Sequence, residues 1–332
     1  MTINLDTKEI NKYVLAFKKI QKANNVLIIN HQRPDGDAFA SACAMIDYME
    51  SIEKKYLSFC ADEPSECHQH LPHIEKINSN INNLNLFKYD LIIVLDSGNL
   101  DRTGLADEIT TLQQEKQDSF IIEFDHHPKQ DDYSNIEIRN TNAASTTEVL
   151  YYFFKINKIR FTKNIANCIL SGIIDDTDSF LHPNTTEKTI NIASEMLIWG
   201  AQLPRITKNK WFNKSLDSMK LWGIALSNLQ INKKYNLAFS ILKKEHTENI
   251  TDEDDIYTSI ANYFSSLYGV NGILFLREEG DNIIKASLRS AHPTCDISKI
   301  AKLFPGGGGH AKSSGFVIDG KFEKQGNKWV VI

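Results

Sequence analysis

The sequence predicts an α/β protein in which a doubly wound, mainly parallel sheet is followed by a smaller α/β domain with a mixed sheet. Short apolar runs alternate with helical patterns up to about residue 180, as in chains that build parallel sheets with right-handed crossovers. The run Leu91–Leu95 is apolar at every position, which is typical of a strand covered on both faces. After Asn236 the apolar runs become strand-like. We therefore expect domains at 1–190 and 232–332, joined by a helical connector at 191–231.

The elements follow in order along the chain. The expected strands of the first domain are Val26–Ile29, Tyr56–Phe59, Leu91–Leu95 and Phe120–Ile122, with a helical pattern over Ala38–Met49. The stretch from about 186 to 229 is helical in pattern and contains three of the four tryptophans. Beyond it, strand patterns recur at Leu237–Leu242, 271–278 and 283–290, before a run of four glycines. A mixed sheet fits this second part.

Composition excludes several classes of protein. The 332 residues are 42% hydrophobic, which is enough for packed cores, and the net charge is −5 without a long run of Lys or Arg. A protein that coats long nucleic acid would need a basic surface, so any nucleic-acid partner should be short. No apolar run approaches a membrane span, and the N-terminus carries acids, so the cytoplasm is expected. The five cysteines indicate reduced packing residues, and a homodimer remains an open option.

Acids and histidines follow three of the expected strands. These residues are His31, Asp35 and Asp37 after the first, Asp96 after the third, and Asp125, His126 and His127 after the fourth. A helical pattern ending near Ile174 leads into Asp175, Asp176 and Asp178. Ligands of open α/β sheets bind outside the carboxyl ends of the strands, so these side chains should converge there.

So many carboxylates in one place require counter-charge, and divalent cations supply it. Oxygen and imidazole ligands without cysteine favour Mn²⁺, with Mg²⁺ or Fe²⁺ as alternatives. About six ligands suit two ions roughly 3.5–4 Å apart, an arrangement built for phosphoester hydrolysis. An Asp at a single strand end is often only a helix N-cap, and two adjacent histidines alone are weak support. The hypothesis depends on four segments converging.

The glycine run is a second candidate site. Successive N–H groups of Gly307, Gly308 and Gly309 could form an anion-binding nest, although Pro-Gly also starts ordinary turns. Arg289 ends a strand pattern and can grip a phosphate with two hydrogen bonds, while His310 can stack on a base. By contrast, the segment "CADEPSECHQHLPH" superficially suggests zinc, but its spacing matches no usual site and favours a surface loop.

The motifs resemble those of the DHH phosphoesterase superfamily. They read "NHQRPDGDAFAS", "LDSGNLDR", "FDHHP" and "GIIDDTDSF", and "SLRS…FPGGGGHAKSSGF" resembles the associated DHHA1 domain. The match runs in order from about residue 25 to 318. The chain is similar to nanoRNase and pAp-phosphatase proteins, which degrade very short oligonucleotides and 3′-phosphoadenosine 5′-phosphate (pAp). Relatives cleave cyclic di-AMP or its linear product pApA.

The resemblance implies a role for each motif residue. One metal is expected on His31, Asp35 and Asp96, and the second on Asp37, Asp96, His126 and Asp176. His127 would lie beside the scissile phosphate as a donor or general acid, and Asp125 would orient a neighbouring imidazole. Arg102 would add charge near the transferred phosphoryl group. Arg289, Gly307, Gly308, Gly309 and His310 would hold the nucleotide's terminal phosphate and base.

Two positions depart from the family pattern, and other functions compete. Ala40 stands where Gly is common, and Asp178 where the fourth motif usually has Gly. The leading hypothesis is a phosphodiesterase for very short oligonucleotides that also acts on pAp. The alternatives are a dedicated cyclic di-AMP phosphodiesterase and a non-catalytic nucleotide sensor. An inorganic pyrophosphatase and a RecJ-type exonuclease fit the second domain and the net charge less well.

Overall fold

The computed structural model describes residues 5–115, 119–211, 215–247, 253–280, 282–292, 294–326 and 328–332. The chain divides into two compact units, Met1–Asn213 and Lys214–Ile332. The first contains a sheet with the strand order β3-β2-β1-β4-β5-β6, in which every pairing is parallel. The second contains a mixed sheet of order β11-β12-β10-β9-β8-β7. The predicted fold class is confirmed.

The strands of the first unit are short and mostly apolar. Their bounds are β1 Asn25–Asn30, β2 Lys55–Phe59, β3 Ile77–Asn78, β4 Leu91–Leu95, β5 Phe120–Asp125 and β6 Ile136–Arg139. All five residues of β4 are buried, because helices cover both faces of the sheet. The sequence pattern did not predict β3 and β6, which are only two and four residues long.

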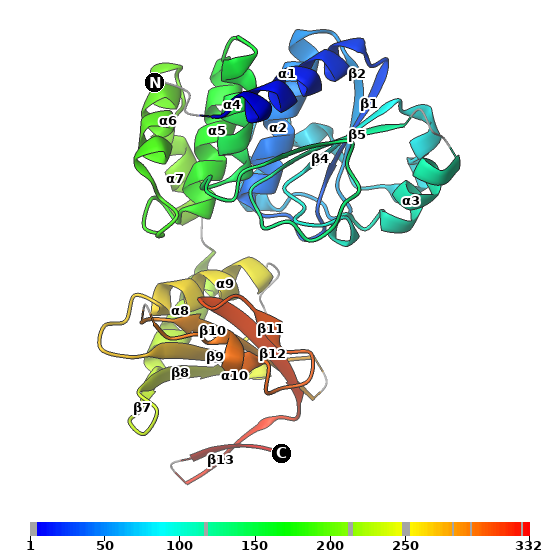
Figure 1. The fold of residues 1–332 in the computed structure, drawn as a ribbon. Helices are drawn as coiled ribbons and strands as arrows, with labels where there is room; N and C mark the ends of the chain where they lie inside the picture. Colours follow the sequence, from blue (N-terminus) through cyan, green and yellow to red (C-terminus); the bar gives the residue numbers. More distant parts are fainter. Residues whose placement is uncertain are drawn as a thin grey trace. The chain divides into compact units, whose positions relative to one another are not determined.

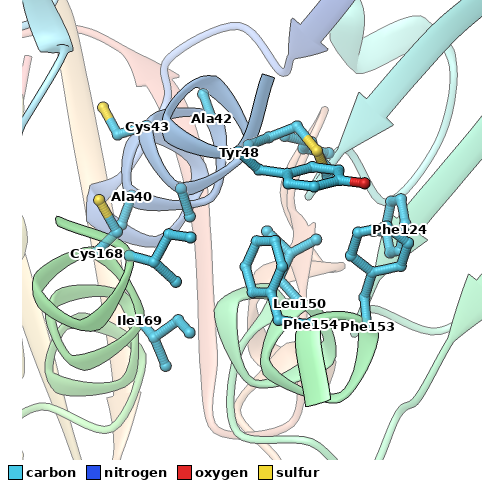
Figure 2. Packing of buried hydrophobic residues seen from close by; sticks show 14 of the residues in the cluster. Ala40, Ala42, Cys43, Tyr48, Phe124, Leu150, Phe153, Phe154, Cys168 and Ile169 are labelled. Atoms are coloured by element: carbon cyan, nitrogen blue, oxygen red, sulfur yellow. The ribbon is translucent and has the colours of Figure 1, made fainter. Parts of the chain in front are cut away.

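Helices cover the two faces of this sheet unequally (Figure 1). They are α1 Thr7–Lys22, α2 Gly36–Ser51, α3 Ala106–Glu115, α4 Thr146–Ile156, α5 Lys163–Asp176, α6 Glu187–Ile198 and α7 Leu203–Trp211. One apolar cluster joins α1, α2, α4 and α5 to one face, and a smaller cluster joins α3 to the other. Figure 2 shows Tyr48 of α2 facing Phe153 and Phe154 of α4, whose rings it meets edge-on at 5.8 and 5.9 Å between centroids.

The larger cluster also accommodates Ala40. Its side chain is fully buried among the residues of α2 and α5 that Figure 2 displays, together with Cys43, Cys168 and Ile169. The methyl group of Ala40 is therefore packed in the core. Cys43 and Cys168 are buried thiols, as expected for packing cysteines.

The second unit begins with a helix of the expected connector. Its helices are α8 Leu216–Ser227, α9 Glu253–Phe264 and the short α10 Ser298–Ala301. Its strands are β7 Gln230–Asn232, β8 Leu237–Leu242, β9 Gly272–Glu279, β10 Ile283–Ser290, β11 Gly308–Gly309 and β12 Ser313–Asp319, with a separate hairpin of β13 Phe322–Gln325 and β14 Lys328–Val331. The helices of the expected connector are divided between the units, α6 and α7 in the first and α8 in the second. No helix in the described ranges is both long and apolar enough to cross a membrane.

Candidate active site

The motif residues meet at the carboxyl ends of three adjacent strands, β1, β4 and β5. His31 follows β1, Asp96 follows β4, and Asp125 is the last residue of β5. Asp35 caps the N-terminus of α2 by accepting hydrogen bonds from the N–H groups of Asp37 and Ala38, at 3.1 and 3.0 Å. Asp35 can therefore cap the helix and still act as a ligand, because both capping hydrogen bonds go to Oδ1 and leave Oδ2 available.

Four groups of acids and histidines have potential ligand atoms within 4.8 Å of one another. They are His31, Asp35 and Asp96; Asp37, His126 and Asp176; Asp96, His126 and His127; and Asp35, Asp175 and Asp176. The first two groups match the two ligand sets implied by the family resemblance, apart from the shared Asp96. Asp96 joins them, because its Oδ2 lies 3.9 Å from His31 Nε2 and its Oδ1 lies 3.6 Å from His126 Nε2. The structure thus brings all six expected metal ligands together.

Three buried atoms of this cluster test whether a cation fits. His31 Nε2, Asp96 Oδ2 and Asp176 Oδ2 have no hydrogen-bond partner among the described residues. His126 Nε2 lies 3.2 Å from Asp176 Oδ2, but a neutral ring whose lone pair faces the carboxylate donates no hydrogen bond to it. Buried polar atoms are rarely left in this state, because losing hydration without a partner costs free energy. All three atoms are the ones that a metal would need. The donor set therefore fits divalent metal ions.

The hydrogen bonds of His31 prepare its ring for this role. Its Nδ1 lies 2.7 Å from the carbonyl oxygen of Gln32, to which an N–H at that position would donate. Nε2 then carries the lone pair on the side of Asp96. Metal-bound histidines commonly donate their other N–H to a carbonyl in this way. Arg102 Nη2 also lies 3.2 Å from Nδ1. If Nδ1 carries the hydrogen that it donates to Gln32, it cannot also accept a hydrogen bond from Arg102.

Electrostatics in the metal-free cluster are unfavourable. Burial and the charge of Asp35 raise the pKa of Asp37 to about 7. Burial, followed by the neighbouring carboxylates, raises the pKa of Asp96 and of Asp176 well above their usual range. Burial and the charge of His127 lower the pKa of His126 to about 4, so its ring is neutral and able to bind metal. Bound cations would remove this repulsion.

Metal removal should therefore make stability depend on pH. In the metal-free protein Asp37 keeps its proton up to a higher pH in the folded than in the unfolded state, so its contribution to stability is complete below about pH 4 and is lost as pH rises to about 7. We expect the Tm of EDTA-treated protein to fall across this interval relative to protein with Mn²⁺. Thermal unfolding at several pH values measures it. An unchanged difference between the two forms across the interval would contradict a cation-binding role for Asp37.

The N-terminus of α4 supports the cluster, a contribution that the sequence did not predict. The N–H groups of Thr146 and Thr147 donate to the two oxygens of Asp37 at 2.6 and 3.1 Å, and Thr147 Oγ1 donates at 2.8 Å. Thr146 Oγ1 donates to Asp96 Oδ1 at 2.7 Å. Helix N-termini favour anions, so α4 orients two carboxylates at once. The pattern Ser145-x-x-Glu148, which starts a capped helix, was the available sequence signal.

Asp125 holds His127 rather than a metal. Its Oδ1 accepts from the backbone N–H of His127 at 2.7 Å and lies 2.9 Å from the ring Nδ1, while its Oδ2 accepts from Gly98 N–H at 2.6 Å. Burial raises the pKa of Asp125, but the hydrogen bond and charge of His127 outweigh burial and lower it to about 2. The ionised carboxylate therefore accepts a hydrogen bond from Nδ1, and Nε2 of His127 is left for other partners.

Arg102 lies beside the same residues. A methyl group placed on Gly98 would come within 3.1 Å of Arg102 Nη1 and 3.6 Å of the His127 ring, so the two side chains flank this glycine. Gly98 has φ +72°, in the left-handed region that glycine adopts readily. Arg102 is thus placed next to His31 and His127.

Asp178 stands in a turn of left-handed residues. Asp178, Ser179 and Phe180 have φ values of 48°, 62° and 70° directly after α5. Glycine is the usual residue at such a position, but Asp and Asn also tolerate it. The backbone at position 178 therefore accepts Asp as well as Gly. The negative charge of the Asp178 side chain is the difference that remains between the two residues.

Two substitutions separate the effect of backbone conformation from the effect of charge at Asp178. We expect both Asp178→Asn and Asp178→Gly to lower the KM for an anionic substrate by up to several fold, since a screened charge contributes about 1 kcal/mol or less. Both variants should unfold within about 1 kcal/mol of the wild type. Steady-state kinetics with thermal unfolding measures this. A lower KM in the Gly variant alone would instead assign the effect to backbone strain.

In the second unit, Arg289 and the glycine run lie at one end of the mixed sheet. Arg289 pairs across the sheet with Ser313, and the backbone N–H of His310 donates to Ser313 O at 2.7 Å. Asn262 of α9, which the sequence did not single out, accepts from Arg289 Nε at 2.7 Å. The side chain of Arg289 is therefore fixed in place.

The glycines differ from the expected nest. Gly308 and Gly309 form the edge strand β11 against β12. A methyl group on Gly307 would collide with the carbonyl oxygen of Ala301, so this glycine allows the chain to pass close to α10. The glycines consequently form the edge of the mixed sheet, and His310 follows directly after this edge strand.

The alternative zinc segment does not form a ligand cluster in the described part of the chain. Cys60 is buried, and its thiol contacts His31 O at 3.4 Å. His73 Nε2 instead lies 2.8 Å from Asp47 of α2, which also accepts from Thr162 and Asn164. The segment is mostly a partly exposed loop, close to the surface loop that the sequence favours, with Cys60 and Leu71 buried.

Comparisons with known proteins agree with the fold. Residues 25–173 match the DHH family, N-terminal domain. The chain resembles bifunctional oligoribonuclease and PAP phosphatase NrnA from Bacillus subtilis, at 25% identity over 91% of each chain. The probable NrnA of Streptococcus mutans is 28% identical over 92% of each chain. The crystal structure of an exopolyphosphatase-related protein from Bacteroides fragilis has a TM-score of 0.83 and 25% identity, covering 99% of this chain and 94% of that one. The resemblance to DHH phosphoesterases is confirmed.

Proposed function

We propose that the protein is a metal-dependent phosphodiesterase that hydrolyses very short oligonucleotides to mononucleotides, and that it also removes the 3′-phosphate of pAp. The observation that carries the proposal is the set of buried, unsatisfied atoms on His31, Asp96 and Asp176 within a cluster of acids and histidines. The relatives named as oligoribonuclease and PAP phosphatase support the substrate class.

Two divalent ions, Mn²⁺ in the first place, would be held by the six expected ligands. His31, Asp35 and Asp96 would hold one, and the other would take the group Asp37, His126 and Asp176 with Asp96 shared between the two. When bound, such ions activate water and neutralise charge on the phosphoryl group. Thr146 and Thr147 hold two of the carboxylates in the required orientation.

The remaining steps belong to the protein's own groups. His127 donates from Nδ1 to Asp125, which leaves Nε2 for the substrate. When the ring also carries a proton on Nε2, that N–H can bond the scissile phosphate or give its proton to the leaving oxygen. Arg102 adds positive charge beside it. In the second unit, Arg289 and His310 bind the terminal phosphate and base of the substrate.

A panel of substrates tests the proposal. We expect Mn²⁺-dependent hydrolysis of pApA and of slightly longer oligoadenylates at higher kcat/KM than that of cyclic di-AMP, with release of phosphate from pAp. Cyclic di-AMP hydrolysed faster than every linear substrate would establish the alternative, a dedicated cyclic di-AMP phosphodiesterase. Binding of pApA without hydrolysis would indicate a nucleotide sensor.

Arg289→Ala should mainly weaken substrate binding. A charge-assisted hydrogen bond contributes about 1.5–3 kcal/mol, so we expect KM for pApA to rise roughly 10- to 100-fold with kcat changed by less than about threefold. Asn262→Ala should shift KM in the same direction by less, because Asn262 orients Arg289. Arg160→Ala, at an exposed position of the first unit, is the control. A loss of kcat at unchanged KM would refute the binding role of Arg289.

A further inference from the structure

Arg139 is a buried cation at the edge of the first sheet, three residues beyond the start of β6. It pairs in register with Asp125 on β5, and its side chain is only 7% exposed. A buried guanidinium needs several acceptors to replace its lost hydration. Its partners therefore show what it is placed to hold.

The guanidinium contacts four groups. Nη1 donates to the backbone carbonyl of His127 at 2.6 Å and lies 3.5 Å from Asp125 Oδ2. Nη2 pairs with the buried Glu123, and Nε donates to Glu137 at 2.9 Å. Glu123 in turn accepts from Ser134 Oγ at 3.2 Å. All three nitrogens are thus engaged, in a fixed planar fork that a lysine could not reproduce.

Two of these contacts converge on the same histidine. Asp125 holds the ring and the backbone N–H of His127, and Arg139 holds the backbone carbonyl of His127 while its charge faces the other oxygen of Asp125. His127 follows the strand in a loop, and its side chain is 29% exposed, so packing alone does not fix it. Its main chain is anchored on both sides by this pair.

We propose that Arg139 is a positioning residue for His127. It sets the orientation of Asp125 and the main chain of the loop, and through them the direction of His127 Nε2. The inference rests on the proposed function, in which His127 meets the scissile phosphate. The competing role is purely structural, as a clamp between β5 and β6.

Arg139→Lys is the main test, because it keeps the charge that Glu123 and Asp125 require and removes the simultaneous contact with the His127 carbonyl. We expect kcat for pApA to fall on the order of 10²-fold, the usual effect of misplacing a catalytic group by about 1 Å. KM and the affinity for Mn²⁺ should change by less than about twofold. Arg160→Lys, an exposed position, is the matched control and should behave as the wild type.

The same substitution in a His127→Asn background separates positioning from clamping. If Arg139 acts through His127, adding Arg139→Lys to His127→Asn should reduce kcat by less than about twofold further. An equal loss in both backgrounds, or a parallel loss of Mn²⁺ affinity and Tm, would overturn the proposal in favour of a clamp. Wild-type kcat in Arg139→Lys would also overturn it, whereas an inactive wild-type protein would refute the proposed function itself.

Discussion

Asp96→Asn should abolish Mn²⁺-dependent hydrolysis of pApA, with kcat reduced at least about 10³-fold. Asp96 lies between the two ligand groups, and the stabilisation supplied by metal ions amounts to several kcal/mol. Asparagine suits the position in other respects. Asp96 has φ +59°, which Asn tolerates, and Thr146 can still donate to its carbonyl oxygen. Steady-state kinetics over a range of Mn²⁺ concentrations measures the loss.

The unfolding of this variant provides its own control. The pKa of Asp96 is raised by burial and by neighbouring acids, so removing the charge relieves repulsion in the metal-free protein. We expect the Tm of metal-free Asp96→Asn to equal or exceed that of the metal-free wild type, while the increase in Tm on adding Mn²⁺ is lost. Near-wild-type activity would refute the bridging role of Asp96. A much lower Tm of the metal-free variant than of the metal-free wild type would show a structural role instead.

Gly172→Ala should have the second largest effect. Gly172 lies in α5, where a methyl group would collide with Asp37 Oδ1 and Thr147 Oγ1. Overpacking of this kind costs about 1–3 kcal/mol of stability. Because Asp37 must move, we expect activity to fall on the order of 10²-fold and Mn²⁺ affinity to fall with it. Calorimetric titration with Mn²⁺ together with steady-state kinetics measures both quantities.

Gly223→Ala is the matched control, since Gly223 is also helical and no described atom lies within 4 Å of a methyl group there. This variant should keep full activity and gain up to about 1 kcal/mol of helix stability. Gly172→Ala with unchanged Mn²⁺ affinity would contradict the close packing of α5 against Asp37.

The sequence alone predicted the parts of this protein that rest on strong local patterns. The all-apolar strand β4 and the acids that follow β1, β4 and β5 were read correctly because strand ends of a parallel sheet meet at one edge. Their convergence was expected from the sequence, and the structure adds the individual contacts, among them the one that identifies His127 as the imidazole held by Asp125.

The missed residues act through tertiary contacts that leave a weak local signal. Arg139 lies on a four-residue strand, too short for a periodic pattern, and its partner Asp125 becomes a neighbour only through β5–β6 pairing. Thr146 and Thr147 look like ordinary first-turn residues of a helix until α4 is placed against Asp37. Asn262 is one polar residue in the helix α9, and only the fold brings it to Arg289.

In the function we propose, two metal ions held by the cluster of acids and histidines drive hydrolysis of short oligonucleotides. The most direct measurement counts the Mn²⁺ ions bound per chain while following AMP release from pApA in the same samples. We expect two ions per chain, AMP release that rises with their occupancy, and no release after EDTA treatment. AMP release from metal-free protein, or full activity with a single bound ion, would contradict the claim.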